Sequence, residues 1–233
     1  MRAWLHFLVI LFALGACGDD GLSQAVADDP GTGTQTLRVT ASACATPNLK
    51  TASTSTDFQT EFSARITLAQ QTVTSGHVTV TSVTGKVPLT YRDGSWHGFA
   101  ASYDEVYTLD VTSGEHAITG ARINGPDIQV ITAPMQDDKV DTSQPLMLTW
   151  MRERIADHTT VEIGPSYSAK IPDNGSFVIE PGVLRADRTG QRQNTLHLIR
   201  TNTLEPAGAI TGSSFDVELD NEVDIEALPL QRR

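Results

Sequence analysis

Short apolar runs alternate with polar residues along most of the chain from residue 36 onward, and turn residues separate them. Thr, Val and Ile are frequent in these runs, as they are in half-buried strands. After the first 16 residues, no segment shows a sustained apolar period of about 3.6 residues, which would indicate an amphipathic helix. The pattern therefore predicts an all-β fold.

The strands predicted in the first half cover residues 36–43, 58–68, 77–83, 86–91, 96–101, 106–111, 116–123 and 128–132. Those predicted in the second half cover residues 144–150, 160–163, 167–171, 176–179 and 195–200, with a last strand that begins at Phe215. Asp93-Gly94 suits the positive φ angles of a tight hairpin. The run 172–175 (Pro-Asp-Asn-Gly) is a second strong turn signal.

Residues 134–143 are polar and follow no pattern, so we expect a domain boundary there. The prediction is two antiparallel β-sandwich domains, residues 36–133 and 134–233, each of the usual size of about 100 residues. One larger sandwich is the alternative.

One strand of the second half carries a family resemblance. Leu146, Leu148 and Trp150 share a strand face, and the run Pro-Leu-x-Leu-x-Trp resembles an early strand of fibronectin type III and related immunoglobulin-like sandwiches. The resemblance implies that Trp150 packs in a core. It covers this run alone, because the tyrosine corner and the Cys…Trp…Cys pattern of such domains are not found.

Apolar and acidic residues alternate strictly from Phe215 to Ala227, apart from Asn221. A hairpin with a two-residue turn at 220–221 would pair Glu218 with Val223 and bring acids into the core. A three-residue turn would set like charges opposite each other. We therefore predict one continuous strand with a bend or bulge near Asn221. Its outer face would carry six carboxylates: Asp216, Glu218, Asp220, Glu222, Asp224 and Glu226.

This acidic row has two interpretations. It is typical of a solvated face that discourages edge-to-edge aggregation. Alternatively, it is a patch for Ca²⁺ or for a basic partner, since Ca²⁺ prefers clustered carboxylate oxygens.

The N-terminus has the pattern of a secretory signal. Arg2 precedes an apolar run, residues 4–14, which is shorter than the roughly 20 residues that span a bilayer. Leu14, Gly15, Ala16 and Cys17 then resemble the lipobox of bacterial lipoproteins. The resemblance implies a signal peptide of residues 1–16, cleavage between Ala16 and Cys17, and a lipid on the Cys17 thiol. An ordinary signal peptide with a chance cysteine and a retained transmembrane anchor are the alternatives.

Residues 17–35 are mostly small, polar and acidic, which predicts a flexible tether behind the lipidated cysteine. In enteric lipoproteins, Asp directly after that cysteine retains the protein in the inner membrane. Here Gly18 holds that position, so we expect the outer membrane.

The net charge of −11 argues against nucleic acid or anionic lipid headgroups as partners, since both need basic patches. Cys44 is the second of two cysteines, so lipidation of Cys17 leaves it without a partner in the chain. We interpret Cys44 as a small buried residue rather than a reactive thiol.

No catalytic, metal-binding or cofactor motif is found, so no catalytic residue, metal site or cofactor is predicted. The candidate bases are His77, His97, His116, His158 and His197. Ser95 and His97 are explained better by the hairpin than by catalysis. Two further groups have alternative interpretations. Trp96, Tyr103 and Tyr107 are core residues or a ligand platform, and Arg185, Arg188, Arg192 and Arg200 lie in a solvated loop or face the acidic strand.

The sequence therefore predicts a lipid-anchored cell-envelope protein with non-enzymatic β-sandwich domains. These domains would bind or scaffold envelope proteins or glycans, and the membrane would be contacted through the N-terminal lipid. A lipid-anchored hydrolase with an unrecognised site and a divalent-cation-binding module are the alternatives.

Overall fold

The computed structural model describes residues 27–184 and 193–228. Within these ranges the regular structure is β-strand, apart from two short 3-10 turns, Ser55–Asp57 and Gly164–Ser166. The predicted all-β class is confirmed.

Between residues 27 and 133 the structure has ten strands: β1 (Thr32–Gly33), β2 (Leu37–Pro47), β3 (Phe58–Leu68), β4 (Gln71–Thr72), β5 (His77–Ser82), β6 (Lys86–Arg92), β7 (Ser95–Ala100), β8 (Val106–Ser113), β9 (His116–Asn124) and β10 (Val130–Ala133). Those after residue 133 are β11 (Asp138–Asp141), β12 (Leu146–Met151), β13 (His158–Ile163), β14 (Tyr167–Ile171), β15 (Ser176–Ile179), β16 (Gln193–Leu204) and β17 (Ser214–Leu228). The Asp93-Gly94 hairpin turn is confirmed, since both residues have positive φ, 53° and 91°.

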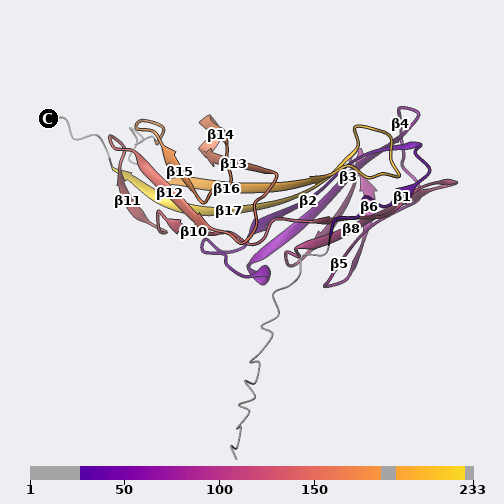
Figure 1. Cartoon of the computed structure of the whole chain (residues 1–233), viewed down its shortest axis with the longest axis horizontal. Coiled ribbons are helices and arrows are strands. Elements are labelled where there is room, and N and C mark those ends of the chain that lie inside the picture. Colours follow the sequence, from indigo (N-terminus) through magenta and orange to yellow (C-terminus); the bar gives the residue numbers. More distant parts are fainter. Residues whose placement is uncertain (1–26, 185–192, 229–233) are drawn as a thin grey trace, which may run out of the picture.

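A large sheet runs the length of the molecule in the order β1-β9-β8-β5-β6-β7-β3-β2-β17-β16-β13-β14 (Figure 1). A smaller sheet has the order β10-β12-β15. Neighbouring strands are mostly antiparallel, but β17 lies parallel to both β2 and β11.

Two hydrophobic clusters lie against the inner face of this sheet. In the first core, side chains of β2, β3 and the start of β17 pack against those of β5, β8 and β9. In the second core, β13, β16 and the rest of β17 pack against the small sheet, where Trp150 is 4% exposed. The burial predicted for Trp150 is therefore confirmed.

Strand β17 takes part in both cores. Phe215, Val217 and Leu219 belong to the first core, and Val223 and Ile225 to the second. Its register with β16 has no shift, so the continuous strand is confirmed. Of the two irregularities predicted near Asn221, a bend or a bulge, the bulge is wrong. No extra residue is needed because β17 changes neighbours along its other edge: β2 pairs with it as far as Leu219, and β11 from Ile225.

The segment before β2 lies along β9 instead of forming a free tether. The amide of Asp29 donates to the Arg122 carbonyl at 2.9 Å, and the amide of Arg122 donates back to Asp29 at 2.7 Å. Thr32 and Gly33 then pair with β9 as β1. The prediction of a tether through residue 35 thus differs from the structure over residues 27–35. These residues bury little side chain and are held by backbone hydrogen bonds, which composition does not reveal.

Candidate functional site

A buried charged cluster lies where the two cores meet. Arg200 projects from the inner face of β16 and is 0% exposed. Its guanidinium reaches Asp127 Oδ1 at 3.1 Å and Asp173 Oδ2 at 3.0 Å. Asp127 follows β9 and Asp173 lies in the turn between β14 and β15, so one side chain joins segments that are distant in sequence.

The remaining carboxylate oxygens of this cluster are also occupied. Asp173 accepts hydrogen bonds from Trp150 Nε1 at 3.0 Å and from the Ala156 amide at 2.8 Å. Asp127 accepts from the amides of residues 153 and 154. Burial opposes the effect, but these hydrogen bonds and the charge of Arg200 lower the pKa of Asp127. The cluster is saturated by the protein itself, which makes it a structural clamp.

Two buried amides complete the junction beside this cluster. Gln129 Nε2 donates to the carbonyls of Leu198 and Leu219, which lie on β16 and β17. Asn221 Nδ2 donates to the carbonyls of Ala52 and Gln129. Asn221, the one exception in the apolar-acidic alternation of β17, therefore serves to hold two chain segments against the sheet.

The predicted acidic row lies on the outer face of β17, where five of its side chains are half-buried and Asp224 is buried. Cations from neighbouring segments pair with it. Lys50 Nζ lies 2.5 Å from Glu222 and 3.3 Å from Asp224, and Lys139 lies 3.6 Å from Glu226. The row is thus partly neutralised within the chain.

His197 is the histidine that the fold brings to this row. Its Nδ1 lies 3.0 Å from Asp220 Oδ2 and 3.6 Å from Glu222 Oε2. The hydrogen bond to Asp220, with the charges of Asp220, Glu222 and Glu162, raises the pKa of His197. Burial and the neighbouring carboxylates likewise raise the pKa of Glu218.

Cys44 lies on the same outer face and is half-buried, so its predicted place in a core is wrong. In β2 the odd-numbered residues point inward, so Cys44 points outward. Its cross-strand partners are Glu61 on β3 and Glu218 on β17. Burial and the charge of Glu218 raise the pKa of the Cys44 thiol to about 11. The thiol is therefore protonated at neutral pH, in agreement with the unreactive interpretation.

The other histidines do not converge. His97 lies 2.8 Å from Ser95 Oγ along one strand face and 3.7 Å from Glu61, and His116 lies 2.9 Å from Thr36 Oγ1. His77 and His158 are exposed on β5 and β13. The aromatic residues Trp96, Tyr103 and Tyr107 are buried in the first core, which confirms the core interpretation over a ligand platform.

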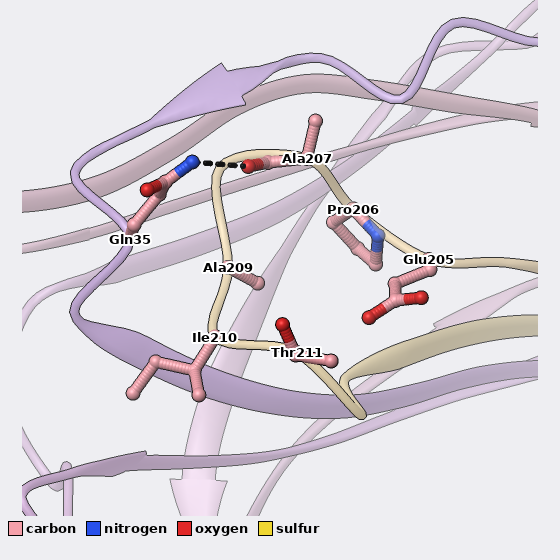
Figure 2. Close-up of a pocket in the computed structure, with 7 residues that line it drawn as sticks. All are labelled: Gln35, Glu205, Pro206, Ala207, Ala209, Ile210 and Thr211. Atoms are coloured by element: carbon pink, nitrogen blue, oxygen red, sulfur yellow. Dashed lines mark hydrogen bonds between the residues drawn. The ribbon is translucent and has the colours of Figure 1, made fainter.

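A shallow hollow of about 470 Å³ lies at the far end of the first core, between Gln35 and the loop that joins β16 to β17 (Figure 2). Its lining residues are Gln35, Glu205, Pro206, Ala207, Ala209, Ile210 and Thr211. Glu205 accepts a hydrogen bond from the Gly212 amide at 2.9 Å, and Gln35 Nε2 donates to the Ala207 carbonyl at 3.5 Å. In the sequence, a loop rich in turn residues is the one feature that marks the position of this hollow.

Within 27–184 and 193–228, no three His, Cys, Asp or Glu side chains are grouped to hold a metal ion. In the same part of the chain, no helix is long and apolar enough to cross a membrane. The lipobox residues and Arg185, Arg188 and Arg192 lie outside the described residues.

No family model and no curated protein matches this chain by sequence. The solved structures that resemble it weakly include the following two. One is described as structural insight into host cell surface retention of a 1.5-MDa bacterial ice-binding adhesin; it is 13% identical, with a TM-score of 0.27 over 82% of this chain and 66% of that one. The other is a Bacteroides ovatus protein of a mixed-linkage glucan utilization locus, SGBP-B, in complex with a mixed-linkage heptasaccharide; it is 6% identical, with a TM-score of 0.16 over 82% of this chain and 60% of that one.

This chain therefore spans about two thirds of the length of the first structure and less of the second. Both TM-scores are too low for either likeness to support an inference about this chain.

Proposed function

We propose that this chain is a lipid-anchored cell-envelope protein whose β-structured part binds or scaffolds other envelope components. The lipobox-like run from Leu14 to Cys17 at the end of an apolar segment supports the anchor. Two or more acyl chains hold a protein stably at a membrane, whereas one does so only marginally. Gly18, rather than Asp, after Cys17 supports the outer membrane as its location.

The large sheet supports the proposed binding role. Because β17 belongs to both cores, strands from β14 to β7 form one sheet whose outer face is not interrupted at the junction. The clamp of Arg200, Asp127 and Asp173 fixes the two cores at that junction. A broad and rigid face of this kind suits an extended protein or glycan partner better than a small molecule, which needs a concave site.

The anchor is tested by replacing the lipidated cysteine. In cells, Cys17→Ser protein should leave the membrane fraction or accumulate with its signal uncleaved, while Cys44→Ser protein, the matched control, should stay in the membrane fraction. A Cys17→Ser protein that is processed and remains in the membranes like the wild type would contradict the anchor.

The binding role is tested by photo-crosslinking in intact envelopes. A crosslinker at Thr201, on the outer face of β16, should capture a discrete envelope protein or glycan. The same group at Val83, an exposed residue between β5 and β6, should not capture that product. Equal, non-specific capture at both positions would contradict a partner on this face.

A further inference from the structure

The outer face of the small sheet carries no charge, in a chain with a net charge of −11. Its strand residues are Val130, Thr132, Met147, Thr149, Met151, Ser176 and Val178. Three of them are large and apolar yet open to solvent: Met147 is 49% exposed, Met151 62% and Val178 39%. Met147 and Val178 are a direct cross-strand pair, so these apolar side chains adjoin.

The opposite face of the same region has the reverse character. There β17 presents Glu222, Asp224 and Glu226, and β13 adds Glu162. The second core thus lies between an acidic outer face and an uncharged one. Apolar side chains that adjoin on a solvent-exposed face indicate a contact surface rather than scattered exposure.

The described chain begins on the side of the molecule that carries the uncharged face. The small sheet packs on the inner face of β13, β16 and β17 in the second core. Strand β9 lies near the far end of the large sheet's strand order and packs on the inner face of β2, β16 and β17, so both lie on the same side of β17. Arg122 Nη2 donates to the Ala27 carbonyl at 3.0 Å, and the Asn124 amide donates to Asp28 Oδ1 at 2.7 Å. Asn124 ends β9, and β10 of the small sheet begins at Val130, at most about 20 Å further along the chain.

We propose that the uncharged face of the small sheet lies against the lipid surface to which Cys17 is attached. This inference rests on the proposed lipid anchor. Residues 18–26 separate Cys17 from Ala27. When extended, the chain from Cys17 to Ala27 reaches at most about 35 Å, so the anchor holds this side of the molecule close to the headgroups. The acidic face of β17 then points away from the membrane.

Charge and side-chain chemistry both favour this orientation. Anionic headgroups repel carboxylates, so the outer face of β17 is unsuited to a membrane contact, whereas the small sheet meets no such repulsion. Methionine is flexible and apolar and adapts to an irregular apolar boundary. The lipid keeps the face at a high effective concentration near the bilayer, so even a weak contact is populated.

Site-specific fluorescence on the full-length lipidated protein tests the proposal. In a Cys44→Ala background, Met147→Cys carries an environment-sensitive dye, and Glu226→Cys carries it on the acidic face as the control. The two sites are similarly open, since the Glu226 side chain is 40% exposed and Met147 49%. The proteins are reconstituted into phosphatidylcholine vesicles with and without nitroxide-labelled lipid, and vesicle flotation is measured in parallel.

We expect the dye at position 147 to shift to the blue and to lose intensity with nitroxide lipid, and the dye at position 226 to do neither. Flotation without quenching at position 147 would overturn the orientation and leave the anchor standing. Protein that does not float would overturn the anchor, and the orientation with it. Shielding of position 147 in lipid-free dimers of the Cys17→Ser protein would identify the face as an interface between copies and overturn the lipid contact.

Discussion

At the residue scale, the fully buried charge of Arg200 lies at the junction of the two cores. Replacing Arg200 with Met leaves Asp127 and Asp173 buried without their main cation. Removing one partner of a buried ion pair typically costs about 3–5 kcal/mol. We expect Arg200→Met to lower the free energy of unfolding by this amount in urea titrations, while Arg92→Met, at an exposed residue, changes it little.

The cost of Arg200→Met should depend on pH. The pKa of Asp127 is lowered in the folded protein, so its ionic contribution is present above the unfolded pKa and is lost as pH falls through the folded one. The wild type and the variant should therefore converge in stability under acid conditions. A cost that is constant with pH would mean that packing, not charge, explains the variant.

We expect the stabilising contribution of His197 to depend on pH in the opposite direction to that of Asp127. Asp220 raises the folded pKa of His197 above its ordinary value of 6.5, so the protonated ring stabilises the fold below that pH. This contribution is lost as pH rises through the folded pKa. Melting temperatures of the wild type and His197→Gln should thus differ most below pH 6.5 and converge above the folded pKa; a difference that grows with pH would contradict the pairing.

The sequence predicted some of these residues and not others. The outward position of Cys44 could have been predicted from the sequence. Val39, Ala41 and Ala43 are apolar residues at alternate positions of its strand, so Cys44 lies on the opposite face. Arg200 could not be assigned, because its partners Asp127 and Asp173 are distant in sequence and no spacing joins them.

At the scale of the elements, Asn221 marks the point at which β17 passes from one core to the other. Asn221→Leu removes both donors to the carbonyls of Ala52 and Gln129. Leaving buried acceptors unsatisfied costs about 1–3 kcal/mol. Chemical denaturation should show a loss of this size, whereas Asn48→Leu, at an exposed residue, should be close to neutral; an Asn221→Leu protein as stable as the wild type would show that the amide does not hold these segments.

The alternation of apolar and polar residues predicted most strand positions, but it did not predict which strands pair. Phe58–Leu68, Tyr167–Ile171 and Ser176–Ile179 were predicted with the bounds that they have. Alternation reports only which side of a strand is buried. The parallel pairing of β17 with β2 joins residues about 170 positions apart, and no turn signal connects them.

At the scale of the whole molecule, β17 belongs to both cores, so cutting the chain between its two halves should disrupt both. A fragment of residues 134–233 lacks β10 of the small sheet and leaves Phe215, Val217 and Leu219 without the first core. We therefore expect the isolated fragment not to fold, as measured by the absence of a cooperative thermal transition. A fragment with a sharp transition would instead support two independent domains divided at residue 134.

The proposed function depends above all on the lipid on Cys17 that we propose holds this protein in the cell envelope. The most direct measurement is mass spectrometry of the N-terminal peptide of the mature protein from membranes. We expect a peptide that begins at Cys17 and carries a diacylglyceryl group on its sulfur. A mature N-terminus at any other residue, or an unmodified Cys17, would contradict the lipid anchor.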